Sequence, residues 1–415
     1  MHESIEKVQR ALLFSLDTGE YDTEESLQEL EELTASAGAE AVLTMSQKRA
    51  APESATCMGS GMAEEVTEIC KNEDIDLVIF DRELSPTQKR NLEKIFNVPV
   101  IDRTMLILDI FALRAQSSEG KLQVELAQLK YMLPRLTGRG VEMSRLGGGI
   151  GTRGPGETKL ETDRRHIRRK IENLKAQLKK LEAVRAETTK RRRKEHMVTV
   201  AIVGYTNAGK STLMNYLTQA GVLAEDKLFA TLDPTARSLQ LPSGKTVVLV
   251  DTVGLIRRLP HHLVEAFRST LEQAAQADII LNICDASSSE AGSHIAVTNE
   301  ILESLGAGDR PIITVFNKCD LISPELVSVR VQDAVRISAK TGDGISELLK
   351  RIEENLPDKT FRTELLFPFD KNGIAAILRA EGEIVKEEYV ESGLRVTADV
   401  IERHLHLVKD FEIKE

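Results

Sequence analysis

Two patterns of apolar and polar residues alternate along the first part of the chain. Short apolar runs predict β-strands, and the amphipathic stretches between them have the spacing of a helix face. The predicted strands cover 11–16, 41–45, 76–80 and 99–101, and the predicted helices cover 24–37, 61–73 and 86–97. Strands and helices that alternate in this way indicate a small parallel α/β domain, which we assign to residues 1–102. Gly59-Ser60-Gly61 fits a tight turn before the second helix better than a ligand site.

Longer helical patterns follow. Residues 103–137 have the apolar spacing of one long helix. A second long helix is predicted from about Leu160 to Lys194, because its apolar residues recur at spacings of 7, 4, 3, 4, 3 and 3, as in a coiled coil. We expect the two helices to pair antiparallel as a hairpin over 103–195, with the connecting loop, residues 137–159, at its tip.

The predicted tip loop has an unusual composition, with eight glycines, one proline and three arginines. A connection of about 20 residues within a folded region is uncommon unless it has a function. Glycines let the backbone approach a partner closely, and arginines supply planar donors for phosphate. We therefore favour contact with RNA over a flexible linker. The expected contact residues are Arg139, Arg145, Gly147, Gly148, Gly149 and Arg153.

Positive charge is concentrated in the same region. The formal net charge of the chain is −10, but residues 135–195 carry 19 Lys and Arg against 8 Asp and Glu, a local balance of +11. One basic segment in an acidic protein suggests a polyanionic partner, although a solvated helix face has the same composition.

Composition excludes several classes of protein. Apolar residues make up 41% and charged residues 29%, an ordinary globular balance. The sequence contains no run of about 18 apolar residues, so we expect no membrane-spanning helix. We also expect no secretory signal, because acids precede the short apolar stretch at the N-terminus. The four cysteines lie far apart, which argues against a zinc ribbon or a disulfide framework. We expect a multidomain cytoplasmic protein, with peripheral association with membranes left open.

The strongest pattern lies in the centre of the chain. Residues 198–203 predict a buried strand that leads directly into GYTNAGKST, residues 204–212. This is the phosphate-loop pattern GxxxxGK[ST] in the strand–loop–helix context that it requires. We expect backbone N–H groups to face the phosphates, Lys210 to contact the β- and γ-phosphates as a catalytic residue, and the Ser211 hydroxyl to bind Mg²⁺. The predicted nucleotide contacts are Gly204, Tyr205, Thr206, Asn207, Ala208, Gly209, Lys210, Ser211 and Thr212.

A second buried strand, within TVVLVDTVG (246–254), ends in an acid. Asp251 is placed to hold Mg²⁺, and Gly254 can offer its N–H to the γ-phosphate, which is a catalytic role. The predicted nucleotide contacts of this segment are Asp251, Thr252, Val253 and Gly254.

Two further strand ends predict which base is bound. PIITVFNKCD (311–320) ends in Asn317, Lys318, Cys319 and Asp320, and AVRISAK (334–340) ends in Ser338, Ala339 and Lys340. A carboxylate at Asp320 can accept from N1–H and N2–H₂ of guanine, whereas adenine would leave it unpaired at a high cost. The backbone of 338–340 can meet the guanine O6. These elements together predict a guanine-nucleotide-binding domain, residues 196–360.

The first switch has to lie between Thr212 and Asp251. KLFATLDPTARSL (227–239) offers Thr231 and Thr235 as ligands for Mg²⁺. We favour Thr231, also as a catalytic residue, because FATLDP resembles the corresponding segment of several bacterial GTPases. Thr235 opens a predicted strand. The predicted nucleotide contacts here are Phe229, Ala230, Thr231, Leu232 and Asp233.

Leu255 stands where signalling GTPases carry the glutamine that orients the attacking water. A leucine side chain neither donates nor accepts a hydrogen bond. Hydrolysis by the chain alone is therefore expected to be slow, and water has to be positioned by backbone, by another residue or by a partner.

With these motifs, the chain resembles the HflX-type GTPases, a ribosome-associated family. The resemblance covers nearly the whole length, through residues 90–136 and the segments GYTNAGKST, FATLDPT and DTVGLI. Its most specific part is GTRGPGETKLETDRR, which GTPases in general lack. It implies binding to the large (50S) subunit with the tip directed toward rRNA near the peptidyl-transferase centre. Together with Leu255, this leads us to expect that the ribosome stimulates GTP hydrolysis. The resemblance also implies dissociation of stalled or idle 70S ribosomes under stress.

Two other functions stay open at this stage. An RNA-modification or ribosome-assembly GTPase acting on rRNA or tRNA would have similar switch segments, but no modification domain is visible. A binding module that uses GTP only as a structural ligand is compatible with Leu255. Met62 replaces an expected lysine in the turn at Gly59, which argues against a ligand role for the N-terminal domain. Residues 361–415 predict a small α+β domain without a chemical motif, and we expect a monomer.

Overall fold

The structure is a computed structural model of the whole chain. It describes residues 8–136, 155–194, 197–218, 228–229, 235–258, 260, 263, 274–308, 310–322, 333–357, 360–368, 372–381, 383–390, 392–401 and 405–413. Contacts divide the chain into two compact units. The larger comprises Met1–Gln240 and Lys245–Leu348, and the smaller comprises Leu241–Gly244 and Leu349–Glu415. The division into four domains proposed from the sequence stays a prediction.

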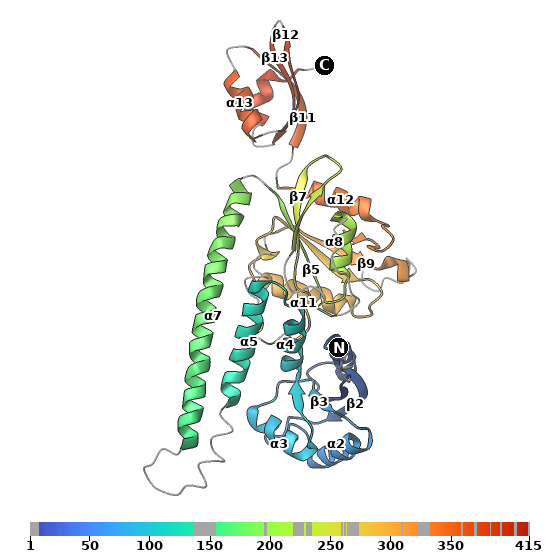
Figure 1. Cartoon of the computed structure of the whole chain (residues 1–415). Coiled ribbons are helices and arrows are strands. Elements are labelled where there is room, and N and C mark those ends of the chain that lie inside the picture. Colours follow the sequence, from blue (N-terminus) through green and yellow to red (C-terminus); the bar gives the residue numbers. More distant parts are fainter. Residues whose placement is uncertain are drawn as a thin grey trace, which may run out of the picture. The chain divides into compact units, whose positions relative to one another are not determined.

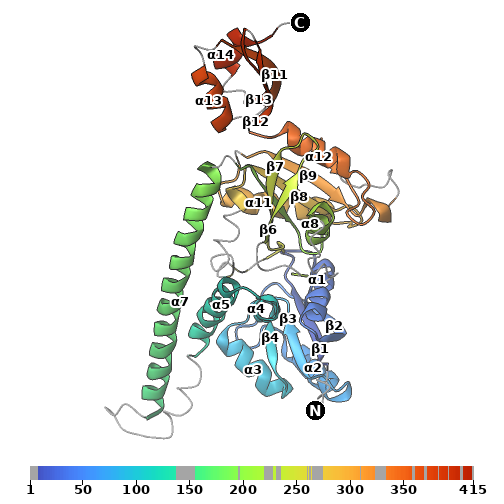
Figure 2. The same cartoon turned by 45° about the horizontal axis from the view of Figure 1, so that its top comes forward.

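The larger unit begins with a four-stranded parallel sheet in the order β2-β1-β3-β4 (Figures 1 and 2). Its strands are β1 (Arg10–Asp17), β2 (Glu40–Lys48), β3 (Leu77–Phe80) and β4 (Val100–Asp102). The connecting helices are α1 (Thr23–Ser36), α2 (Ser60–Asn72) and α3 (Pro86–Phe96). Alternate residues of β1 pack on opposite faces, Leu13 with α1 and Phe14 with α2 and α3, so β1 is buried on both sides. The parallel α/β fold predicted for this part of the chain is confirmed.

The single long helix predicted over 103–137 is wrong, because two helices occupy this stretch. They are α4 (Arg103–Arg114) and α5 (Ser118–Arg135). Between them Ala115 is extended, with φ −64° and ψ 110°. The Ser117 hydroxyl accepts a hydrogen bond from the Gly120 N–H at 2.8 Å. A serine cap of this kind satisfies a free N–H of the first turn, and it begins a new helix here.

The second long helix is α7 (Pro155–Lys194), which runs beside α5 in the opposite direction (Figures 1 and 2). It begins at Pro155 rather than near Leu160, and proline suits the first turn of a helix. Its buried residues Ile171, Leu174 and Leu178 pack against Leu126 of α5. The hairpin is therefore held by the apolar stripe that its sequence predicts. Residues 137–154, and with them all the predicted RNA contacts, lie outside the described residues.

The rest of the larger unit is built on a six-stranded sheet, in the order β10-β9-β8-β5-β7-β6. Its strands are β5 (Thr199–Gly204), β6 (Thr235–Gln240), β7 (Thr246–Asp251), β8 (Ile279–Asp285), β9 (Ile312–Asn317) and β10 (Val335–Arg336). All neighbours pair parallel except β6 and β7. The helices are α8 (Lys210–Thr218) and α11 (Ala291–Ser304), with a 3₁₀ turn at Cys319–Leu321. The helix α12 (Ile345–Glu354) begins in this unit and ends in the smaller one. Parallel pairing brings the carboxyl ends of β5, β7, β8, β9 and β10 to one edge.

The smaller unit is an antiparallel sheet in the order β11-β13-β12. Its elements are β11 (Thr360–Phe367), α13 (Asn372–Glu381), β12 (Glu383–Val390), β13 (Gly393–Ile401), α14 (Leu405–Val408) and the 3₁₀ turn Lys409–Phe411. Its core includes Phe367, Leu378 and Val396. Within the described part of the chain, no helix is long and apolar enough to cross a membrane.

Candidate nucleotide site

The phosphate-loop residues 204–212 lie at the carboxyl edge of the six-stranded sheet. Strand β5 is buried and delivers Gly204 to the edge, and α8 begins at Lys210. The Lys210 Nζ donates to the carbonyl oxygens of Gly204 at 3.1 Å and Tyr205 at 2.7 Å. Burial lowers the pKa of Lys210 to about 8, while Asp251 opposes the shift. The ammonium is thus held inside the curve of the loop.

The acidic end of β7 faces the start of α8. Asp251 has no exposed surface, and its Oδ2 accepts a hydrogen bond from the Ser211 hydroxyl at 3.1 Å. The Thr252 hydroxyl donates to the Ile202 carbonyl at 2.8 Å, which fixes the end of β7 beside β5. The two predicted Mg²⁺ ligands that the structure describes, Ser211 and Asp251, are therefore in contact.

Asn317 joins the phosphate loop to the predicted guanine segments. Its Nδ2 donates to the Ala208 carbonyl at 2.8 Å, and its Oδ1 accepts from the Ala339 N–H at 2.9 Å. A Cβ atom added at Gly209 would lie 2.2 Å from Asn317 Nδ2, and Gly209 has φ +89°. The loop can approach Asn317 this closely only because residue 209 is glycine.

Asp320 lies beside the 338–340 segment. Its Oδ1 accepts a hydrogen bond from the Ser338 hydroxyl at 2.7 Å. Lys318 adopts a left-handed conformation with φ +62°, and its Nζ pairs with Asp285 at 2.8 Å. The structure thus brings together the four strand-end segments that the sequence singles out: 204–212, 251–254, 317–320 and 338–340.

The first switch is only partly described. Ala230, Thr231, Leu232 and Asp233 lie outside the described residues, so the choice of Thr231 as a ligand stays a prediction. Phe229 is described: it is 2% exposed and packs edge-to-face on Phe111 of α4, with ring centroids 4.7 Å apart. Its side chain therefore packs in the core, and a contact of Phe229 with nucleotide stays a prediction.

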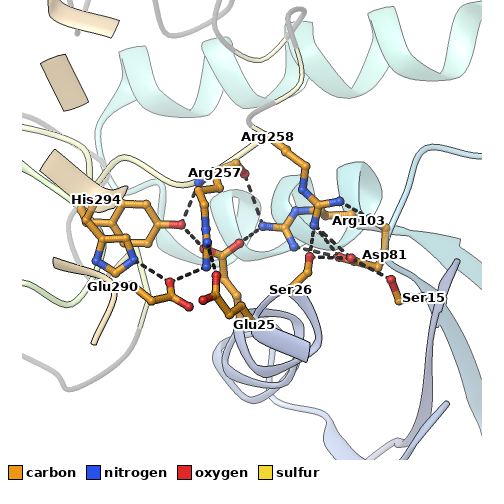
Figure 3. A network of polar contacts seen from close by, with 11 residues as sticks. Ser15, Glu25, Ser26, Asp81, Arg103, Arg257, Arg258, Glu290 and His294 are labelled. Atoms are coloured by element: carbon orange, nitrogen blue, oxygen red, sulfur yellow. Dashed lines mark hydrogen bonds and ion pairs between the residues drawn. The ribbon is translucent and has the colours of Figure 1, made fainter. Parts of the chain in front are cut away.

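A polar network beside the phosphate loop is absent from the sequence-based predictions. The Tyr205 hydroxyl donates to Glu29 of α1 and accepts the Arg257 N–H at 2.8 Å. Figure 3 shows Arg257 and Arg258 reaching toward carboxylates of the first 102 residues. The one sign of this network in the sequence is the pair of adjacent arginines after DTVGLI, and their neighbours in the sequence do not identify their partners.

Comparison with known proteins gives three matching family models along the chain. They are described as GTP-binding GTPase N-terminal (residues 24–112), GTP-binding GTPase Middle Region (114–192) and 50S ribosome-binding GTPase (199–318). The GTPase HflX of Caldanaerobacter subterraneus subsp. tengcongensis is 50% identical over 400 residues, which cover 96% of this chain and 93% of that protein. This chain belongs to the HflX family of ribosome-binding GTPases. The GTPase HflX of Escherichia coli is 43% identical, with 89% of this chain and 88% of that one covered.

Among solved structures, this HflX chain is similar to a GTP-binding protein of Sulfolobus solfataricus in complex with GDP. The identity is 26% and the TM-score 0.44, with 84% of this chain and 98% of that one covered. The family relationship shows that the chain is an enzyme, a GTPase that hydrolyses GTP to GDP and phosphate.

The residues of this HflX site suit the metal that GTPases of this class generally use with GTP, which is Mg²⁺. A hydroxyl and a fully buried carboxylate, on Ser211 and Asp251, offer the hard oxygen donors that Mg²⁺ prefers. No group of three or more His, Cys, Asp or Glu among the described residues could hold a metal.

Proposed function

We propose that this HflX chain uses its nucleotide state to control association with the 50S ribosomal subunit, and that the GTP-bound form separates stalled or idle 70S ribosomes under stress. The observation that carries the proposal is the helical hairpin. Its seam is apolar, whereas basic side chains of α7 such as Arg168, Arg169 and Lys179 are exposed. A helix with exposed basic side chains can bind a polyanion such as rRNA. The cytoplasm is the proposed site of action and a monomer the proposed form.

In this proposal GTP lies across the carboxyl edge of the six-stranded sheet. The phosphate loop with Lys210 holds the phosphates, and the Gly254 N–H meets the γ-phosphate. Asp320 pairs with the guanine N1–H and N2–H₂, and residues 338–340 meet O6. The hydrogen bond from Ser338 supports this role, because it orients the Asp320 carboxylate.

Mg²⁺ would be held by Ser211, Asp251 and Thr231. When bound, such an ion neutralises charge on the phosphate oxygens. The side chains of this chain would orient the nucleotide. Lys210 is anchored by two carbonyl oxygens of the phosphate loop, which keeps its ammonium at the loop proposed to hold the phosphates.

Co-sedimentation with 50S subunits tests the proposal. We expect the chain to pellet with 50S in the presence of a non-hydrolysable GTP analogue and much less with GDP. Changing Arg168 and Arg169 to Glu should abolish pelleting at physiological salt, because log affinity for RNA depends on the number of phosphates neutralised. The matched control changes the exposed Lys71 and Lys94 to Glu, which alters the net charge equally. Equal loss in both variants would contradict a specific role of the hairpin.

A further inference from the structure

Thr206 lies where the phosphate loop meets the segment that follows β7. The Thr206 N–H donates to the Leu255 carbonyl at 2.8 Å, which binds the loop to that segment. A Cβ atom added at Gly254 would lie 2.7 Å from Thr206 Cγ2, 3.0 Å from Thr206 Cα and 3.1 Å from Lys210 Nζ. Thr206, Gly254 and the Lys210 ammonium therefore surround one point. The hydroxyl of Thr206 lies beside Gly254 as well, because it is borne by the same Cβ as the methyl group.

The Thr206 hydroxyl is buried without a hydrogen bond. Thr206 is 6% exposed, and its Oγ1 has no partner within the part of the chain that the structure describes. Other hydroxyls nearby are engaged: that of Thr252 donates to the Ile202 carbonyl. The Ser211 hydroxyl donates to Asp251. A buried hydroxyl is normally paired with protein or water, because leaving it unpaired costs free energy. The Thr206 hydroxyl is therefore available to a molecule that enters the site.

The point that these residues surround is the expected position of the γ-phosphate. The lysine of a phosphate loop lies against the β- and γ-phosphates, and the Gly254 N–H is expected to meet the γ-phosphate. The Leu255 side chain cannot orient the attacking water, so the water requires another polar group beside the phosphate. A threonine hydroxyl can both donate and accept a hydrogen bond, and that of Thr206 is engaged by no described residue.

We infer that Thr206 is a catalytic residue, whose hydroxyl forms a hydrogen bond to the water that attacks the γ-phosphate. This role goes beyond the phosphate contacts expected of the loop backbone, and it rests on the position of GTP proposed above. The water oxygen bonds to the γ-phosphorus, and the bond from that phosphorus to the β,γ-bridging oxygen breaks. GDP leaves with the electron pair, and a proton of the water passes to an oxygen of the phosphate. The hydroxyl orients the water and keeps its own proton.

Thr206→Val is the first test, because it replaces the hydroxyl by a methyl group and keeps the packing against Gly254. We expect the single-turnover rate constant for hydrolysis of bound GTP to fall about tenfold, which corresponds to ~1.4 kcal/mol in the barrier. The dissociation constants for GDP and for a non-hydrolysable GTP analogue should stay within about twofold, because the hydroxyl contacts the water. An unchanged rate constant would overturn the inference. So would an equal loss in affinity for the analogue, which would indicate a role in binding.

Thr206→Ser and Thr206→Ala separate the hydroxyl from the methyl group. Serine keeps the hydroxyl, so its rate constant should stay within about threefold of the parent value, whereas alanine should lose as much as valine. Equal losses in the serine and alanine variants would show that the methyl contact with Gly254 matters and the hydroxyl does not. Should Thr206→Val fail to fold, this second pair decides alone.

Thr298→Val is the matched control. Thr298 on α11 is 1% exposed, and its hydroxyl donates to the His294 carbonyl within the same helix at 2.9 Å. We expect its rate constant to equal that of the parent chain. A loss as large as that of Thr206→Val would show that removal of any buried hydroxyl slows hydrolysis, and would overturn the specific role of Thr206.

Lys210→Ala tests separately the position of GTP on which the inference rests. We expect this variant to lose GTP binding, because the ammonium that meets the phosphates is gone. If it binds GTP as tightly as the parent chain, the proposed position of GTP is wrong, and the role of Thr206 with it. If Lys210→Ala loses GTP but Thr206→Val hydrolyses GTP at the parental rate, the position of GTP stands and only the role of Thr206 is wrong.

Discussion

Asn317 illustrates how much one side chain can organise in the nucleotide site. It has one donor and one acceptor group, and it uses the first for Ala208 in the phosphate loop and the second for Ala339. It is 2% exposed, so both hydrogen bonds are shielded from water. A buried amide that is satisfied on both sides fixes the distance between the segments that it joins. Asn317 thereby fixes the position of the phosphate loop relative to the segment that we predict to meet the base.

Asp320→Asn is predicted to weaken GTP binding and to raise the relative affinity for xanthosine triphosphate. The new amide presents a donor where guanine also donates, whereas xanthine has an oxygen there. Loss of the charge-assisted pair should cost roughly 2–4 kcal/mol. Competition binding with both nucleotides measures the change, with Glu303→Gln on the exposed side of α11 as the control. An unchanged preference for GTP would contradict the assignment of Asp320.

Asp109 on α4 predicts a pH dependence of stability. Burial raises the pKa of its carboxyl from 3.8 to about 6, while Lys89 opposes the shift. Because the folded chain binds this proton more tightly than the unfolded chain, the free energy of unfolding falls as pH rises from about 4 to about 6. Asp109→Asn removes this titration. We therefore expect the free energy of unfolding of Asp109→Asn, relative to that of the parent chain, to be higher at about pH 6.5 than at about pH 4.5. Urea unfolding at the two pH values measures the difference. The same difference at both pH values would contradict the prediction.

At the scale of elements, the helix α7 of the hairpin has one face that packs against α5 and another that is exposed. Ile171, Leu174 and Leu178 face α5, and the basic residues of α7 face outward. The seam therefore does not depend on the residues that we propose to meet rRNA. Lys170 pairs with Glu125 across the two helices, but both are exposed, so the pair contributes little to stability.

Shortening the tip by removal of residues 146–154 is predicted to spare GTP binding and to abolish separation of 70S ribosomes. Pro155 is kept because α7 begins there. The phosphate loop lies on another element, so nucleotide affinity should be unchanged. Density-gradient profiles with a GTP analogue give the outcome. Arg153→Ala should give a milder, salt-dependent loss, because it removes a single charge. If the shortened chain still converts 70S to 30S and 50S subunits, the loop is only a linker.

At the scale of the whole molecule, the larger unit joins the nucleotide site to the N-terminal sheet through one core. Tyr205 and Phe229 share a buried cluster with Leu30 of α1 and Phe111 of α4. Packed cores transmit displacement because they have few voids. Movement of the N-terminal domain would therefore be felt at the segment that follows Gly254.

Large ribosomal subunits are predicted to accelerate GTP hydrolysis by at least about tenfold, since one partner-supplied or partner-ordered group is commonly worth this much. The physical reason is Leu255, whose side chain cannot hold the attacking water. Turnover measured with 50S subunits, with 30S subunits as the control, tests this directly. Equal turnover with and without 50S would contradict activation by the ribosome.

Much of the site could be predicted because each part is local in sequence. Residues 204–212 carry their own loop geometry in two glycines, and Asp251, Asp320 and Ser338 each follow an apolar strand that ends at the same edge of the sheet. The stripe of α7 is local in the same sense, since its spacing alone selects the face that packs. The single helix predicted over 103–137 overlooks a signal that the sequence does contain. No large apolar residue lies between Leu113 and Leu122, and Ser117 within this polar stretch caps the new helix.

The sequence by itself determined the fold class, the family and the order of the nucleotide-site motifs, because apolar periodicity and short motifs depend on neighbouring residues. Only the tertiary structure decided which polar and charged side chains meet. Tyr205 and Glu29 are 176 positions apart, and Arg258 and Asp81 are 177 apart. Nothing in the local pattern of either residue selects its partner. Such pairs form because the packing of the two sheets brings α1 beside the phosphate loop, and buried charges then require a partner of opposite sign.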